Sequence, residues 1–143
     1  MQLLSKDFAE MQNLPKKFTC DGEGVCPSFE WIDVPKETKS FVLTCNDPDA
    51  VSGNFIHLVL INIPASTLRI DNIREIEGDF LPSSGGEKSY YPPCPPSGNH
   101  RYIFTLYALD VERIAPESVG EIETILKPHI VASATISGIY ARE

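Results

Sequence analysis

Tyr91-Pro-Pro-Cys-Pro-Pro-Ser-Gly-Asn-His-Arg-Tyr102 is the stretch on which the interpretation of this sequence rests. Its four prolines fix φ at about −65° and remove four backbone N–H groups, so residues 91–96 cannot form a helix or a central strand. From Arg101 the chain becomes rich in aromatic and β-branched residues up to Leu109, which predicts a strand buried on both faces. A stiff surface loop that leads into a core strand is a favourable place for a site.

Length and composition predict a single domain. The chain has 143 residues and 42% of them are hydrophobic, which is enough to bury a sizeable core in one domain spanning residues 1–143. A formal net charge of −8 argues against nucleic acid and against an anionic membrane surface as partners. No apolar run approaches the roughly 20 residues of a membrane span, and the first residues lack the apolar core of a signal peptide. We therefore expect no membrane span and a cytoplasmic location.

The four cysteines are Cys20, Cys26, Cys45 and Cys94, and they lack the paired C-x-x-C spacing of structural zinc sites. We expect neither a bound metal nor another cofactor. Because cytosolic thiols are kept reduced, four free thiols are expected, with a Cys20–Cys26 disulfide as the main alternative.

Several other segments have the composition of strands. They are residues 29–32, 39–46, 55–63 and 132–140. The run Phe55–Ile63 is apolar on both faces, so it should be a central strand of the same sheet as residues 101–110.

A short helix is expected near the C-terminus. Ser118-Val-Gly-Glu121 matches a capping box, the apolar residues that follow have helical spacing, and Pro128 limits the helix. The pattern predicts a mainly β fold of the α+β kind, with antiparallel sheets forming a sandwich.

Three groups of polar residues are candidates for function. Asp47-Pro-Asp-Ala50 stands where a strand ends, and it reads equally well as a solvated turn or as a functional acid pair. His57 interrupts an apolar strand, where it is either a hydrogen-bonded core residue or a ligand contact. His100 and Tyr102 alternate with Arg101, so they share one face of their strand while Arg101 points the other way.

Four stretches of the sequence, taken together, resemble the phosphatidylethanolamine-binding protein family, also called Raf-kinase-inhibitor-like. They are Cys20-Asp-Gly with Trp31, Asp47-Pro-Asp-Ala50, His57 with Asn62-Ile-Pro64, and the stretch from Pro93 to Tyr102. The similarity covers nearly the whole chain and is to the shorter bacterial and archaeal members. It implies a large antiparallel sheet packed on a smaller one, with a small anion pocket at one end that binds phosphate-type groups.

The resemblance also implies which residues form the pocket. The matching ligand-binding positions are Asp47, His57, Cys94, Pro95, Pro96, His100 and Tyr102. Arg101 is expected to pair structurally with a carboxylate, and Asp49 is the candidate. The role of Asp47 beside an anion stays open, because it could orient a histidine, share a proton or meet a ligand amine.

The sequence departs from the family at three positions. Val51, Leu58 and Pro92 stand where the family usually has a proline, an aromatic residue and a glycine. By strand parity Leu58 should face away from His57, whereas Val51 and Pro92 could change the rim of the pocket.

The leading interpretation is a noncatalytic binding protein for a phosphorylated small molecule, a phospholipid headgroup or a phosphorylated side chain. A regulated protein kinase or protease and a homodimer are the protein partners considered. The alternative is a hydrolase in which Asp47, His57 and His100 hold a metal or act as acid and base. The chain lacks H-E-x-x-H, G-x-S-x-G and a glycine-rich phosphate loop, which argues against it. Direct inhibition of a protease through the exposed loops is a third hypothesis.

Overall fold

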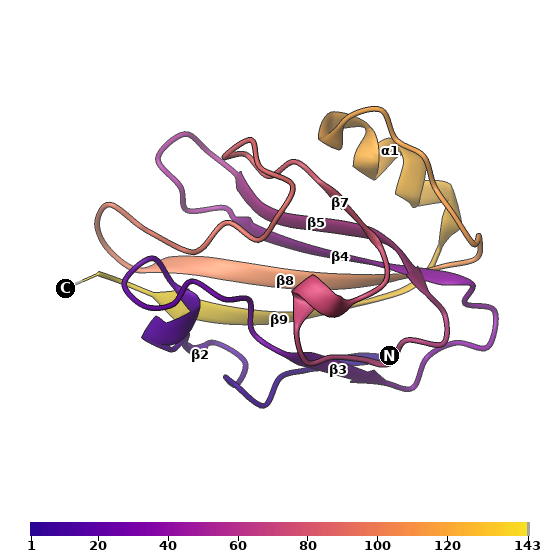
Figure 1. The fold of residues 1–143 in the computed structure, drawn as a ribbon, viewed down its shortest axis with the longest axis horizontal. Coiled ribbons are helices and arrows are strands. Elements are labelled where there is room, and N and C mark those ends of the chain that lie inside the picture. Colours follow the sequence, from indigo (N-terminus) through magenta and orange to yellow (C-terminus); the bar gives the residue numbers. More distant parts are fainter. Residues whose placement is uncertain (143) are drawn as a thin grey trace.

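Two β-sheets pack against each other in the computed structural model, which describes residues 1–142 (Figure 1). The larger sheet has six strands in the spatial order β2-β9-β8-β4-β5-β7, and the smaller one has the order β1-β3-β6. The strands are β1 Gln2–Leu4, β2 Gln12–Asn13, β3 Phe29–Ile32, β4 Ser40–Asp47, β5 Phe55–Pro64, β6 Arg69–Ile70, β7 Asp79–Leu81, β8 His100–Leu109 and β9 Ile130–Tyr140. The expected large sheet on a smaller sheet is therefore confirmed.

The two predicted central strands, β5 and β8, are both interior strands of the larger sheet and flank β4. All their interior pairings are antiparallel, as expected. One pairing differs, because the short β2 runs parallel to β9 at Gln12 and Asn13. A two-residue edge strand reached by a long connection can adopt either direction, so the sequence pattern could not predict this exception.

The core lies between the two sheets. β3 alternates strictly, with Phe29 and Trp31 buried and the residues between them exposed. The ring of Phe29 lies 4.8 Å from that of Phe104 on β8, and the ring of Trp31 lies 5.3 Å from that of Phe41 on β4. Fully burying one such side chain contributes about 1.5–3 kcal/mol, so these contacts hold the smaller sheet on the larger one.

The outer face of the larger sheet is covered only in part. The helix α1 (Ile122–Leu126) packs on Val42, Val59 and Ile61, so β5 is buried on both faces. On β8 the outward residues from Ile103 to Tyr107 are only half-buried. The expectation that β8 is buried on both faces is wrong, because a five-residue helix does not reach across the whole sheet.

The helix itself starts differently from the prediction. A 3-10 turn, Val119–Glu121, precedes α1, and a second one, Lys127–His129, follows it. Ser118 makes no side-chain capping bond, and Glu121 accepts a hydrogen bond from the backbone N–H of Glu117 at 2.9 Å. The predicted capping box is therefore absent, although the helix lies where the apolar spacing placed it. No helix in residues 1–142 has the length and apolar character needed to cross a bilayer.

Candidate functional site

A pocket of about 330 Å³ opens at one end of the larger sheet, where β4 ends and β5 and β8 begin. It contains all seven residues expected to bind ligand and adds five that were not named as ligand contacts. Its lining is Asp47, Ala50, Val51, Ser52, Phe55, His57, Tyr91, Cys94, Pro95, Pro96, His100 and Tyr102. Among the additions, Phe55 lies two residues before His57 and Tyr91 opens the proline loop. Phe55 is close to His57 and Tyr91 adjoins the proline loop, so their closeness to these two predicted parts of the site could have identified them.

Asp47 and His100 form a buried pair at the bottom of the site. His100 Nδ1 lies 2.6 Å from Asp47 Oδ2, and their side chains are only 8% and 4% exposed. Because a carboxylate accepts, Nδ1 carries the proton, and the other ring nitrogen, Nε2, is left for a ligand. Asp47 Oδ1 also accepts the backbone N–H of Asp49 at 2.8 Å. Of the three roles left open for Asp47, this geometry supports orienting a histidine.

His57 is oriented in the same way by a different partner. Its Nδ1 lies 2.6 Å from the carbonyl oxygen of Tyr91, which can only accept, so Nδ1 is again the donor and Nε2 is left free. Burial lowers the pKa of His57, and the bond to Tyr91 opposes this only in part. The imidazole is therefore neutral near pH 7, with Nε2 as an acceptor.

A β-bulge aims His57 into the pocket. Cys45 of β4 pairs with Leu58 of β5 and the next residue, Asn46, pairs with Ile56, so His57 is the extra residue. Leu58 packs in the core between the sheets, and the ring of His57 contacts that of Tyr102 on the same side at 5.2 Å. The expectation that Leu58 faces away from His57 is wrong, because the bulge interrupts the alternation on which strand parity depends.

Aromatic side chains form the rest of the wall. Tyr102 is buried, which raises the pKa of its phenol, so the hydroxyl keeps its proton and can donate. Phe55 and Tyr91 lie with their ring centroids 5.2 Å apart. Gly85 permits this position of Tyr91, since an added Cβ would come within 2.4 Å of the tyrosine ring. The rim is thus apolar around a polar floor.

An ion pair between Arg101 and Asp49 lies just outside the pocket. Arg101 donates to Asp49 through Nε and Nη2, at 2.9 Å each, and also through its backbone N–H. The side-chain bonds from Arg101, helped by the backbone bond, lower the pKa of Asp49 to about 2. The predicted pair is confirmed, and it commits this arginine to a carboxylate.

No lysine or arginine belongs to the pocket lining, as far as residues 1–142 show. Within the same residues no three His, Cys, Asp or Glu side chains are grouped so as to hold a metal ion. A larger hollow of about 740 Å³ lies elsewhere, beside Lys17 and Arg74, but its charged side chains have both signs. The convergence of imidazoles therefore distinguishes the smaller pocket.

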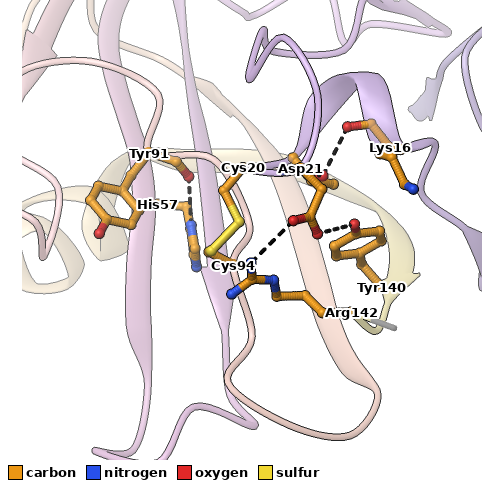
Figure 2. The surroundings of a disulfide bond; sticks show 9 residues. Lys16, Cys20, Asp21, His57, Tyr91, Cys94, Tyr140 and Arg142 are labelled. Carbon is orange, nitrogen blue, oxygen red and sulfur yellow. Dashed lines mark hydrogen bonds and ion pairs between the residues drawn. A yellow bond between two sulfur atoms is a disulfide. The ribbon is translucent and has the colours of Figure 1, made fainter.

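The cysteines differ from the expectation. Cys20 and Cys94, 74 positions apart, form a disulfide with their Cα atoms 5.4 Å apart, whereas Cys26 and Cys45 are free (Figure 2). The predicted four free thiols and the alternative Cys20–Cys26 bond are both wrong. The pairing is decided by tertiary structure, because the fold places the turn that carries Cys20 against the proline loop. There, Cys20 N–H donates to Pro93 O at 3.0 Å. Cys94 lines the pocket as a half-cystine.

The fold and the pocket define a two-sheet β protein with a small cavity at the end of its larger sheet, apolar at the rim and polar at the floor. A family model described as phosphatidylethanolamine-binding protein matches residues 4–141, and the chain belongs to this family. A UPF0098 protein from Aquifex aeolicus is 38% identical, over 100% of this chain and 90% of its own length.

Solved structures agree with this membership. The crystal structure of CT736 from Chlamydia trachomatis, described as a homologue of the same family, has a TM-score of 0.93 and 35% identity, covering 99% of this chain and 97% of the other. That of Escherichia coli YbcL has a TM-score of 0.91 and 27% identity, covering 99% and 98%. The resemblance inferred from the motifs is thus confirmed at the level of the family and its fold.

Proposed function

We propose that this protein is a noncatalytic binding protein whose pocket takes a phosphate-type group. The observation that carries the proposal is the convergence of His57, His100 and Tyr102 on one small cavity, with Nδ1 of each imidazole already engaged by the protein. Each imidazole thereby presents Nε2, and the phenol presents a hydroxyl with no hydrogen-bond partner in the described chain. Such an array suits the oxygens of a tetrahedral anion.

The protonation of the histidines restricts the kind of ligand. With Nδ1–H already donating, an Nε2 atom can donate to an anion only as an imidazolium, and a neutral one can only accept a proton from a P–OH group. In either case, the complex contains a proton that would be missing from a complex between a dianion and two neutral imidazoles. We infer that the ligand is a phosphomonoester near its second ionisation, such as a phosphorylated small molecule or a phosphorylated side chain, or the phosphodiester monoanion of a phospholipid headgroup, which has no P–OH and would need an imidazolium donor.

The test is calorimetric titration with phosphate, phosphorylethanolamine and sulfate. His57→Ala and His100→Ala should each weaken binding by about 1.5–3 kcal/mol, the scale of a hydrogen bond to a charged group. Tyr102→Phe should cost less, since it removes one neutral donor. Arg101→Ala is the matched control, because Arg101 adjoins His100 but points away from the pocket. Equal affinity for wild type and both histidine variants would refute the proposal.

Proton uptake gives a second, independent reading. Sulfate keeps its charge between pH 5 and 8, so any strengthening of its binding below about pH 6.5 reports protonation of the protein. The binding enthalpy should also vary with the ionisation enthalpy of the buffer. The buffer-dependent part of the binding enthalpy should be smaller for the His57→Ala variant. Sulfate affinity that is independent of pH would argue against imidazole donors.

The hydrolase alternative rests on the buried Asp47–His100 pair, which could serve as an acid–base couple. Turnover of a phosphomonoester that is lost in His100→Ala, or binding that strengthens with rising pH and is abolished by a chelator, would support it. Binding without turnover, unaffected by chelator, is the outcome we expect.

The remaining partners and the location are parts of this proposal that need separate tests. Regulation of a protein kinase or a protease would follow from occupation of the pocket, so it should be lost in His100→Ala. A homodimer can be sought by sedimentation. A cytoplasmic location predicts that Cys20 and Cys94 are thiols in the cell, because that compartment is reducing, and alkylation during lysis would show whether they are.

A further inference from the structure

The Cys20–Cys94 disulfide stands apart from the other two cysteines in its accessibility. Both half-cystines are exposed on the surface beside the pocket, whereas Cys45 is buried and Cys26 half-buried. Burial raises the pKa of the Cys26 and Cys45 thiols, which makes them poor nucleophiles. An exposed disulfide can be attacked by an external thiolate, and exposed disulfides are among the more easily reduced.

The disulfide tethers an otherwise weakly held segment. Within the described chain, residues 94–99 make no hydrogen bond. The nearest ones are the bond from Cys20 N–H to Pro93 O on one side and that from His100 Nδ1 to Asp47 on the other. Three members of this segment, Cys94, Pro95 and Pro96, line the proposed ligand pocket. The position of that wall therefore depends on the disulfide and on the packing of the prolines.

The other end of the disulfide is held independently (Figure 2). Asp21, the neighbour of Cys20, accepts a hydrogen bond from the Tyr140 hydroxyl and pairs with Arg142 at 3.2 Å. Tyr140 lies on β9 opposite His100. In the same turn the carbonyl of Phe18 accepts a hydrogen bond from Tyr90 at 2.9 Å. Opening the disulfide would therefore leave the turn in place and free the proline loop.

We propose that the Cys20–Cys94 disulfide is a site of reversible thiol–disulfide exchange that controls the pocket wall formed by residues 94–96. The co-reactant is a dithiol reductant. One of its thiolates attacks a sulfur of the bond, forming a mixed disulfide and releasing the other cysteine as a thiolate. Its second thiolate then displaces the remaining cysteine, so the reductant leaves as a disulfide and two electrons pass to Cys20 and Cys94, which take up two protons. In the oxidised form, the wall is already ordered for binding. In the reduced form, residues 94–96 must become ordered when ligand binds, which weakens the affinity.

This inference rests on the proposed function for its effect on ligand, but the tether itself can be tested without one. The chain has three histidines, and His129 pairs with Asp110 beyond the far end of β8 from the pocket. The imidazole NMR signals of His57 and His100 therefore report on the pocket, and that of His129 is an internal control. Opening the bond with dithiothreitol should move the first two signals and leave the third in place.

The experiment compares oxidised and reduced wild type with Cys20→Ser, which opens the bond without changing a pocket residue. Cys26→Ser is the control, because Cys26 is unbonded. Thiol counts after unfolding should be two for the oxidised protein and four after treatment of the folded protein with dithiothreitol. Sulfate should bind about tenfold more weakly to the reduced protein and to Cys20→Ser, reflecting the ordering of a few loop residues. Cys26→Ser should match the oxidised wild type.

Three results would overturn the inference. They are a bond that dithiothreitol opens only after unfolding, unchanged His57 and His100 signals in the opened protein, and equal sulfate affinity with the bond open and closed. If sulfate and phosphate bind to neither form, the proposed function fails, and the histidine signals alone decide the tether: movement supports it and constancy refutes it.

Discussion

Two hydrogen-bonded side-chain pairs lie side by side at the mouth of the larger sheet, and they are built from the same two short segments. Asp47 pairs with His100, which we call the inner pair, and Asp49 pairs with Arg101, which we call the outer pair. The side chains of the inner pair are 4% and 8% exposed, those of the outer pair 30% and 48%. Both pairs join β8 to the end of β4, yet only the inner pair faces the pocket.

The difference follows from the alternation of side chains along a strand, which places one pair in the pocket and the other pair outside it. Neighbouring residues of β8 point to opposite sides, so His100 is buried in the pocket and Arg101 lies in solvent. The outer pair is bidentate, which fixes geometry, but water screens it and its contribution to stability is small. The inner pair is shielded from water, so losing one partner is costly. Three experiments can break or sharpen this comparison.

The largest effect is expected from removing one member of the inner pair. His100→Ala should lower the free energy of unfolding by about 3 kcal/mol at pH 7, because it leaves the Asp47 carboxylate buried with only a backbone N–H partner. Urea denaturation followed by tryptophan fluorescence measures this, since Trp31 is the single tryptophan and lies in the core. Arg101→Ala should shift the midpoint far less. Equal shifts would erase the distinction between the pairs.

A smaller effect should appear when stability is measured between pH 7 and 5. His57 has a lowered pKa in the folded protein because it is buried, so the unfolded chain binds protons more readily below about pH 6.5. The stability that neutral, buried His57 contributes is therefore fully present above about pH 6.5. It is lost as pH falls through the lowered pKa that His57 has in the folded protein.

The matched variant is His57→Asn, whose amide can still donate to Tyr91. It should lose less stability than wild type over this interval in parallel urea titrations. A steeper loss in the variant would show that His57 is not the residue being protonated.

The smallest effect concerns the outer pair in acid. The pKa of Asp49 is lowered from 3.8 to about 2 by Arg101, so its contribution is present above pH 3.8 and fades as pH falls through about 2. Asp49→Asn should flatten the acid limb of a thermal-unfolding profile slightly, and 1 M salt should reduce the difference, because the pair is exposed. A salt-insensitive difference would indicate a less exposed pair.

Part of the site could be predicted from short-range rules, whereas the full set of pocket residues came from the family resemblance. Strand alternation placed His100 and Tyr102 on one face, and the geometry of the guanidinium predicted the pair between Arg101 and Asp49. The prolines of residues 92–96 could only form a loop. The interior position of β5 followed from its apolar residues on both faces.

The errors arise where one local departure or a long-range contact decides the outcome. One inserted residue at His57 reversed the side on which Leu58 lies, and no residue type announces such a bulge. The Cys20–Cys94 bond depends on a contact across 74 positions, which spacing along the chain does not reveal. The half-buried outer face of β8 depends on how far a short helix reaches, and that is a property of the packed structure.

Among residues 1–142 the pocket lining contains no lysine or arginine, which would affect how fast an anionic ligand associates. The chain carries a net charge of −8, and Arg101 just outside the pocket is neutralised by Asp49, so an approaching anion meets a repulsive field. Salt screens such a field beyond about 10 Å at 0.1 M, so added salt should accelerate association, the reverse of an electrostatically steered encounter. A ligand of this pocket would therefore arrive slowly in dilute buffer and faster at physiological ionic strength.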